Sequence, residues 1–405
     1  MLGFDYELRR RGYAGNSCQI VLDLDAVVDS GVLQQRLTEL AGHHPVLRAR
    51  PARGFRSRWK PTRAMPRVRV HEPSERLKER MFNEPLDVRG GELVRFDLVE
   101  RTVMFTWSHA LMDAKSAEYF LALVGSGQAA GPDAGHDWYA ERAVRAGGLR
   151  ARGRQAWREL DRLEAFKRAL PVSLATHRRP KAGAMRYQVV ALSMEETARV
   201  RVQALAMCGL LGDTNYHLAA ALVELDRLHQ RCGCASASYV VPVPVGLRPK
   251  GTRAPLFSNQ ITMILHQFFP EQLASMAPAV SAVKARHADC ARGDFINAGI
   301  TLAQLFRRLP LSVYMWIVKN ELRGEICSLF FGDTGVVEPL LDSFMGARIE
   351  SLAHVPAVTV PPGVGVVFYR FREQLRFTVV HAEGVLSEAE AFGFAAGLRE
   401  RLLNP

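Results

Sequence analysis

The sequence has few cysteines and no long apolar run, and each shortage excludes a class of protein. Its 405 residues include six cysteines, and no two of them form a Cys-x-x-Cys pair. A disulfide framework is therefore not expected, and reduced thiols in a cytoplasmic protein fit this usage best. Cys232-Gly233-Cys234 lacks a second pair of zinc ligands, so we expect a turn there. Apolar runs such as residues 204–211 and 311–318 are shorter than the roughly 18 residues of a membrane span, which leaves at most peripheral membrane contact.

An export signal, internal repeats and low-complexity tracts are also missing from the sequence. Charged side chains near the first residue occupy positions that a signal peptide needs to be apolar. Lys and Arg number 53 against 41 Asp and Glu, a net charge of +12 that is scattered along the chain. Two interpretations stay open: an anionic partner, such as a phosphate-bearing cofactor, an acidic carrier protein or a membrane surface, or simply an arginine-rich surface. No nucleic-acid-binding motif accompanies the charge, so no nucleic acid is expected.

The composition and the order of the patterns predict two mixed α/β domains. Hydrophobic residues make up 48% and charged residues 23% of the chain, which is typical of a globular protein, and the length exceeds one ordinary core. A break in the pattern at residues 171–184 predicts a linker between an N-terminal domain, 1–170, and a C-terminal domain, 185–405. Strands are predicted at 17–25, 68–71, 93–99, 103–107, 187–192, 239–245, 261–267, 325–331, 364–370 and 376–381. Helices are predicted at 30–41, 115–124, 151–170, from 193 onward, at 214–230, 274–291 and 388–402, and a breaker-rich loop at 125–135.

The run Ser-His-Ala-Leu-Met-Asp-Ala at residues 108–114 is the strongest candidate for chemistry. His109 follows an extended segment and precedes a helix, a place from which an imidazole can reach a cleft. An ordinary histidine pKa near 6.5 suits a general base at neutral pH. Asp113 either orients this ring, or caps the next helix and pairs with an arginine. The spacing alone is also compatible with a structural histidine.

In its context, this run resembles the active-site motif of the CoA-dependent acyltransferase superfamily. The superfamily includes chloramphenicol acetyltransferases, condensation domains of peptide synthetases, wax ester synthases and plant HxxxD acyltransferases. Their wider pattern is His-His-x-x-x-Asp-Gly, in which His109 matches the second histidine and Asp113 the aspartate. Ser108 stands in place of the first histidine and Ala114 in place of the glycine. The single-histidine form resembles the plant-type branch.

Three further segments resemble the same superfamily in the same order. Residues 44–49 are similar to its Arg-His-x-x-Leu-Arg segment, and residues 82–96 to the stretch that leads into the motif strand. Residues 242–249, followed by Ser-Asn-Gln at 258–260, are similar to the Pro-Val-Asp-Leu-Arg and Gly-Asn elements of its second domain. The loop predicted at 332–335, after a strand, stands where relatives carry a Ser-Asn-x-Gly loop. The resemblance spans residues 15 to 400.

The resemblance implies two similar chloramphenicol acetyltransferase-like domains, each an α+β two-layer sandwich, with an active-site tunnel between them. His109 would deprotonate a hydroxyl, amine or thiol of the acceptor, which attacks the donor thioester without an acyl-enzyme intermediate. Asp113 would pair with Arg248, and Asn259 or Ser258 would assist in stabilising the oxyanion.

The same resemblance implies which partners the chain takes. The cosubstrate is an acyl-CoA or a phosphopantetheine-linked acyl group, with an acyl or peptidyl carrier protein as the second kind of donor. The acceptor is a small molecule or a lipid, and no permanently bound cofactor or metal is expected. Ser108 and Ala114 motivate an alternative, a catalytically inactive condensation-domain-like protein that binds a carrier protein or an acyl ligand.

Overall fold

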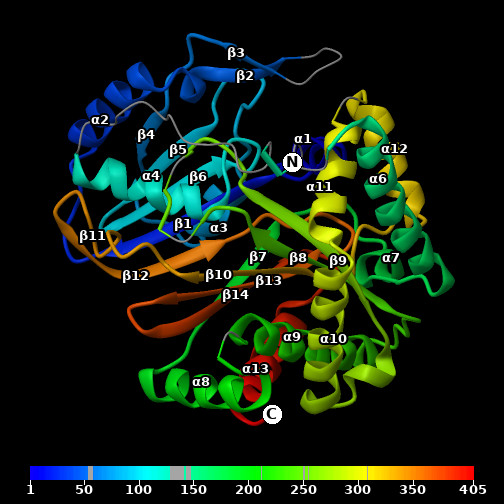
Figure 1. Ribbon diagram of the computed structural model, residues 1–405. Helices are drawn as coiled ribbons and strands as arrows, with labels where there is room; N and C mark the ends of the chain where they lie inside the picture. Colours follow the sequence, from blue (N-terminus) through cyan, green and yellow to red (C-terminus); the bar gives the residue numbers. More distant parts are fainter. Residues whose placement is uncertain are drawn as a thin grey trace.

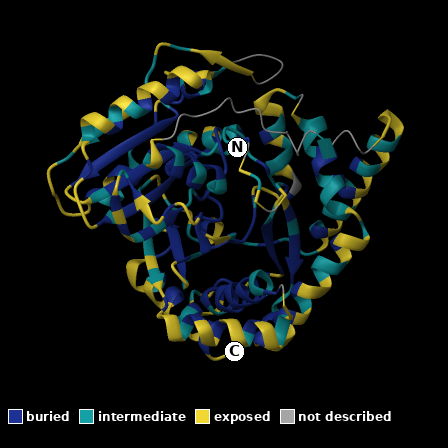
Figure 2. Ribbon diagram, turned by 60° about the vertical axis from the view of Figure 1, so that its left-hand side comes forward, coloured by how far each residue is buried: buried dark blue, intermediate teal, exposed yellow. Residues whose placement is uncertain are grey.

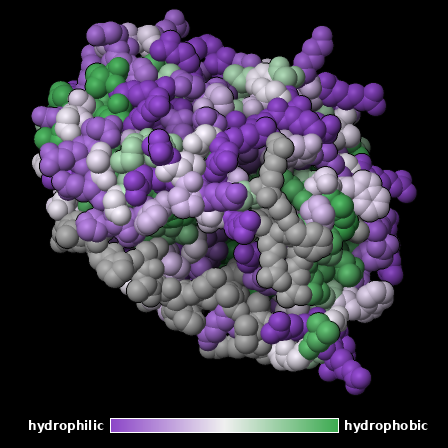
Figure 3. Space-filling view, turned by 90° about the horizontal axis from the view of Figure 1, so that it is seen from above, coloured by the Kyte–Doolittle hydropathy of each residue, from purple (hydrophilic) through white to green (hydrophobic). Residues whose placement is uncertain are grey.

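Two mixed β-sheets with helices packed against them form the centre of the fold (Figure 1). The computed structural model describes residues 1–52, 58–127, 141–142, 147–210, 212–249, 251–253, 255–307 and 309–405. Buried residues follow the strands and the inner sides of the helices, whereas exposed residues lie on the outer helix faces (Figure 2). Seen from above, hydrophilic side chains cover most of the described part of that face (Figure 3).

The first sheet has six strands in the order β11-β12-β1-β6-β5-β4. Only β4 and β5 pair in parallel; the other neighbours are antiparallel. Helices α2 and α4 contribute apolar side chains to the core on one face, and α3 contributes to the core on the other. The elements are β1 (Ser17–Leu24), α2 (Ser30–His43), β4 (Arg67–Val70), α3 (Leu77–Asn83), β5 (Val94–Val99), β6 (Thr102–Ser108), α4 (Ala114–Ser126), β11 (Ser343–Phe344) and β12 (Ala347–Val355).

The second sheet has four strands in the order β10-β13-β14-β7, with β10 and β13 parallel. A separate antiparallel pair, β8 and β9, lies beside it and contacts β10. Helices α8, α9 and α13 lie below the sheet in Figure 1, and α10 packs on α9. The elements are β7 (Met185–Ala191), α8 (Met194–Cys208), α9 (Asp213–Arg231), β8 (Tyr239–Gly246), β9 (Ile261–Phe268), α10 (Met276–Arg292), β10 (Phe330–Val336), β13 (Val364–Phe371), β14 (Gln374–Ala382) and α13 (Glu388–Leu403).

The two sheets meet along β12 and β13. Successive side chains of a strand point to opposite faces, and β13 uses both. Val366 and Phe368 belong to the core that contains α9 and α13, whereas Val367 and Tyr369 belong to the core of the first sheet. One strand therefore joins the two halves through apolar contact on both faces.

The remaining elements lie around these sheets. Helix α6 packs against α11, and α1 against α12. Among the described residues, no helix is long and apolar enough to cross a membrane. The elements are α1 (Leu2–Arg10), η1 (Pro45–Arg48), β2 (Ala49–Ala52), β3 (Arg58–Pro61), α6 (Leu149–Ala165), η2 (Phe166–Arg168), α7 (Leu174–Arg178), η3 (Pro270–Leu273), α11 (Phe295–Phe306) and α12 (Leu311–Glu321).

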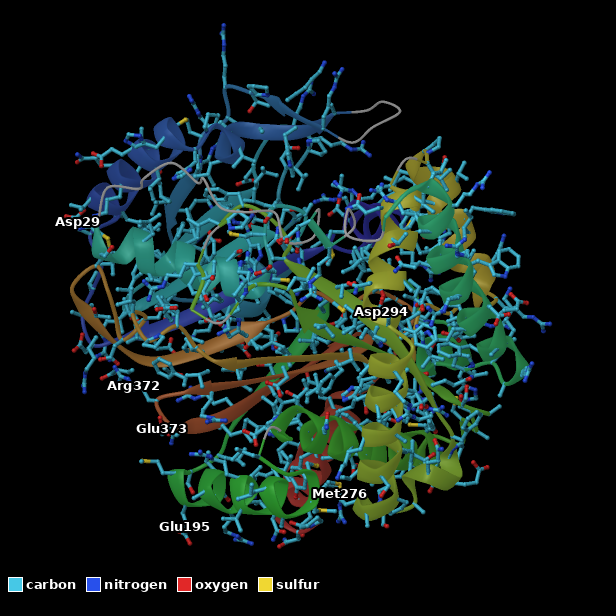
Figure 4. The ribbon with its side chains drawn as sticks, in the orientation of Figure 1. Asp29, Glu195, Met276, Asp294, Arg372 and Glu373 are labelled. Carbon is cyan, nitrogen blue, oxygen red and sulfur yellow. The ribbon has the colours of Figure 1, made fainter. Side chains whose placement is uncertain are left out.

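Local capping explains where α2 and α8 begin, near the residues Asp29 and Glu195 that Figure 4 labels. Asp29 accepts a hydrogen bond from the backbone N–H of Val32 and so starts α2. Ser193 and Glu196 form a capping box around the first turn of α8, the turn that carries the labelled Glu195. The turn predicted at Cys232 is confirmed, with Gly233 in the left-handed region.

The strand predicted at residues 325–331 is wrong in its bounds. The strand β10 begins at Phe330 and continues to Val336, so residues 332–335 lie in a strand and do not form a loop. Gly332 and Asp333 pair in parallel with β13, whereas Thr334 and Gly335 lie in the register shift between Asp333 and Val336, where Gly335 has a positive φ of 68°. Of the loop predicted at 125–135, residues 128–135 lie outside the described residues, and α4 extends to Ser126.

The division into domains at 171–184 stays a prediction. The two parts of the chain are interleaved, because the first sheet contains strands from both. Strands β11 and β12 come from the C-terminal part of the chain, yet β12 pairs with β1 in the first sheet. Helix α7 lies within the segment predicted as a linker.

Candidate active site

The backbone around His109 is held from both halves of the chain. Its N–H donates to the carbonyl of Asn16 at 2.9 Å, and its carbonyl accepts from Nδ2 of Asn259 at 2.9 Å. The indole N–H of Trp107 donates to the carbonyl of Met112 at 3.1 Å, which closes the turn between β6 and α4. The motif is therefore a braced turn in which His109 has little freedom to shift.

Asp113 is the N-cap of α4 and lies 2% exposed. Its Oδ1 accepts from the backbone N–H of Ser116 at 2.9 Å, and its Oδ2 accepts from the backbone N–H of Gln260 at 2.8 Å. The Nη1 of Arg248 lies 3.0 and 2.9 Å from the two carboxylate oxygens. Both oxygens are thus used to fasten the start of α4 to the segment after β8 and the segment before β9.

Arg248 extends this junction beyond Asp113. Its Nη2 donates to Oγ of Ser116 at 2.5 Å and to the carbonyl of Pro255 at 2.9 Å. Neither Ser116 nor Gln260 was predicted from the sequence as part of the site. An N-cap carboxylate at Asp113 predicts the bond from the backbone N–H of residue 116, but the contact of the Ser116 hydroxyl with Arg248 depends on the tertiary structure.

Of the other residues predicted for the site, Ser258 lies at the same junction and Ser108 lies at the end of β6. Ser258 lies two residues before Gln260, whose Nε2 donates to Oγ of Ser258 at 2.8 Å. Ser108 is the last residue of β6 and is buried, pairing in register with Ser17 of β1. The amide of Asn259 serves the backbone of His109, so its assistance to an oxyanion stays a prediction.

The ring of His109 is partly buried, and this burial decides its protonation. Burial lowers the pKa of His109 below the ordinary value of 6.5, and its own backbone carbonyl, Asp113 and Asn259 offset this only in part. The ring is therefore neutral at neutral pH. Its Nδ1 is enclosed and has no hydrogen-bond partner among the described residues, which leaves Nε2 as the nitrogen for an incoming group.

A second polar group lies one turn further along α4. The carboxylate of Glu118 is fully buried, 2.7 Å from Nζ of Lys115 and 3.1 Å from Nε2 of His354 on β12. Burial by itself raises the pKa of Glu118, but Lys115 and His354 outweigh it and hold the pKa below its usual value. The contact between Glu118 and His354, which joins α4 to the first sheet, was not predicted from the sequence. Within the described part of the chain, no group of three or more His, Cys, Asp or Glu side chains could hold a metal ion.

No known family model matches the sequence, and no curated protein sequence matches it. Solved structures match along the whole chain. The first condensation domain of the calcium-dependent antibiotic synthetase has a TM-score of 0.70 and 16% identity, with 100% of this chain and 95% of that chain covered. The trichothecene 15-O-acetyltransferase from Fusarium sporotrichioides has a TM-score of 0.70 and 14% identity, covering 99% and 92%. The epimerization domain from the third module of tyrocidine synthetase B has a TM-score of 0.61 and 13% identity, covering 97% and 91%.

These likenesses define the class of fold. The chain shares its overall fold with these condensation domains and with the O-acetyltransferase, which confirms the fold that the sequence predicts. The matching structures include both condensation domains and an O-acetyltransferase, and each of these is matched over nearly its full length.

Proposed function

We propose that this protein is an acyltransferase that moves an acyl group from a thioester donor to a hydroxyl or amine acceptor. The observation that carries the proposal is His109, a neutral, partly buried imidazole whose backbone is braced by Asn16 and Asn259. A whole-chain likeness to condensation domains and an O-acetyltransferase supports the same class of reaction. The donor is an acyl-CoA or a phosphopantetheine-linked acyl group on a carrier protein.

In this reaction, His109 acts as the general base through Nε2. It takes the proton of the acceptor hydroxyl or amine while the acceptor oxygen or nitrogen attacks the thioester carbonyl. The tetrahedral intermediate collapses, the carbon–sulfur bond breaks, and the imidazolium returns the proton to the leaving thiolate. Because general-base catalysis contributes about 10²- to 10⁴-fold, the remaining acceleration comes from holding the two substrates together.

Asp113 acts as a positioning residue in this proposal. Its two oxygens accept from Ser116, Gln260 and Arg248, so the carboxylate shapes the turn that carries His109. Ser108 and Ala114 support a second candidate, an inactive condensation-type protein that binds a carrier protein or an acyl ligand. Ser108 is 1% exposed, and it stands where many relatives carry a first histidine.

The test measures thiol release from acyl-CoA donors of several chain lengths, and from acyl groups loaded on a carrier protein, against a panel of alcohols and amines. His109→Ala is expected to lower the rate by about 10²- to 10⁴-fold without loss of folding. His43→Ala is the matched control, because His43 is exposed at the end of α2. An unchanged rate in His109→Ala would refute the proposed base. Absence of thiol release from every donor, together with measurable carrier binding, would favour the inactive alternative.

A further inference from the structure

Helix α1 is connected to the backbone of His109 through a single residue, Asn16. Oδ1 of Asp5 on α1 accepts from the backbone N–H of Asn16 at 3.0 Å, and the carbonyl of Asn16 accepts from the N–H of His109 at 2.9 Å. A longer contact of 3.4 Å joins Nδ2 of Asn16 to the carbonyl of Met1. Asn16 is 6% exposed, so water has little access to these bonds. The carboxylate of Asp5 is therefore the shorter of the two ties between α1 and Asn16.

Arg9 holds the carboxylate of Asp5 and also contacts a second segment of the first sheet. Its Nε lies 3.1 and 3.0 Å from the two oxygens of Asp5, and its Nη2 donates to the carbonyl of Leu86 at 2.8 Å. Asn16 directly precedes β1, and Leu86 lies in the segment that leads into β5. Strands β1 and β5 are the two neighbours of β6, the strand that directly precedes His109. The pair of Asp5 and Arg9 thus joins the segments that enter both neighbours of β6.

Gly15 allows the close approach of this pair to the loop after α1. Its φ of 106° lies in the region that favours glycine. A Cβ atom at this position would lie 2.4 Å from Oδ1 of Asp5 and 2.9 Å from Nε of Arg9. Backbone hydrogen bonds to α1 hold residues 11–13 of the loop, and Asp5 then holds Asn16 beyond the glycine.

Other contacts hold α1 in place on its opposite side. Glu7, whose side chain is 7% exposed, lies 2.5 Å from Nζ of Lys319 on α12. The ring of Phe4 packs edge-to-face on that of Phe330, with 6.5 Å between the centroids. Since these contacts fasten the helix to the C-terminal half of the chain, attachment of α1 does not depend on Asp5 alone. The contact of Asp5 therefore has a separate effect, which is exerted on the loop.

We propose that Asp5 is a positioning residue for His109, which acts through the backbone of Asn16 while Arg9 holds its carboxylate. The inference rests on the proposed acyl transfer, in which His109 is the general base. Asn259 holds the carbonyl of His109, and Asn16 holds its N–H. A misplacement of about 1 Å can cost about 10²-fold in rate, so the position of this backbone matters for the reaction.

The kinetic experiment compares two substitutions of Asp5 in the thiol-release assay. Asp5→Ala removes the acceptor for Asn16 and is expected to lower kcat by about 10- to 10²-fold, with KM for the acyl donor unchanged. Asp5→Asn keeps an oxygen that can accept from Asn16, so it is expected to recover most of that loss. Glu7→Gln is the matched control, because it weakens the attachment of the same helix to Lys319 and should leave kcat unchanged. An unchanged kcat in Asp5→Ala, or equal losses in Asp5→Ala and either other variant, would overturn the proposal.

A second measurement needs no turnover and follows hydrogen–deuterium exchange at the backbone N–H of His109. Asp5→Ala is expected to speed this exchange at least about threefold, because the acceptor on Asn16 is no longer held, whereas Glu7→Gln leaves it unchanged. Unchanged exchange in Asp5→Ala would overturn the positioning role. If the unmodified protein releases no thiol from any donor, the proposed acyl transfer fails, and the exchange rates still decide whether Asp5 holds the backbone of His109.

Discussion

Removing the carboxylate of Asp113 is expected to cost the fold far more than removing the ring of His109. The side chains of Asp113 and Arg248 are 2% and 9% exposed, so they form a buried pair. Breaking such a pair by removing one partner costs about 3–5 kcal/mol, because the other charge stays buried without compensation. Loss of the N-cap of α4 would by itself cost about 1 kcal/mol. The same carboxylate makes both contacts, so we expect Asp113→Ala to lower the free energy of unfolding by about 3–5 kcal/mol in total.

A double-mutant cycle isolates the pair from the rest of the junction. Asp113→Asn and Arg248→Met each leave one buried charge, whereas the double variant leaves neither. Residues in contact show coupling energies of about 0.5–3 kcal/mol, and we expect a value in that range here. The assay is urea denaturation of the full chain followed by circular dichroism, with His109→Ala as the comparison.

Two results would refute this reasoning. If the free energy of unfolding of Asp113→Ala lies within about 1 kcal/mol of that of the unmodified protein, the pair contributes no more than an exposed ion pair. If the effects of the two single variants on the free energy of unfolding add up to that of the double variant within about 0.3–0.5 kcal/mol, Asp113 and Arg248 act independently.

Three further predictions concern His109, the buried His266 of β9, and Asn259, which donates to the carbonyl of His109. Burial lowers the pKa of His109, so the rate of thiol release should fall on the acid side only below pH 6.5; an acid limb above that value would contradict a lowered pKa. Burial lowers the pKa of His266 to about 3 in the folded protein. As the pH falls below 6.5, His266 takes up a proton in the unfolded chain but not in the folded protein, so the free energy of unfolding decreases. Between pH 7 and pH 5, the free energy of unfolding measured in urea should fall by about 2 kcal/mol more in the unmodified protein than in His266→Phe. Equal decreases in the two proteins would refute the lowered pKa of His266. Asn259→Ala removes the donor to the carbonyl of His109 and should lower kcat by up to about 10²-fold with little change in KM for the acyl donor; a change in KM alone would indicate a role in binding.

Short-range patterns in the sequence predicted the local parts of the site. The extended segment predicted at residues 103–107 corresponds to the strand that ends at Ser108, and the helical pattern predicted at 115–124 corresponds to α4. The capping box at Ser193 was recognisable because its two partners are three residues apart. Such features depend on neighbours within one turn or one strand, so the sequence contains them.

Long-range pairing was outside the reach of these patterns. Residues 332–335 contain two glycines and an aspartate, which predict a loop, yet they lie within the strand β10, whose Gly332 and Asp333 pair in parallel with β13. The addition of β12 to the first sheet joins segments more than 300 residues apart. Local propensity is a weak determinant where a neighbouring strand supplies the backbone hydrogen bonds.

The sequence by itself determined the motif, the order of the supporting segments and the mixed α/β class, because each depends only on residue types and their spacing along the chain. Only the tertiary structure decided what the side chains contact. The resemblance already implied the pairing of Asp113 with Arg248, whereas the structure alone placed Asn259 against the carbonyl of His109 across 150 residues and Ser116 against Arg248 across 132 residues. The structure also buried the ring of His109, which sets its pKa. Burial and charge pairing depend on what the folded chain brings close, and a linear pattern of residues carries no record of that distance.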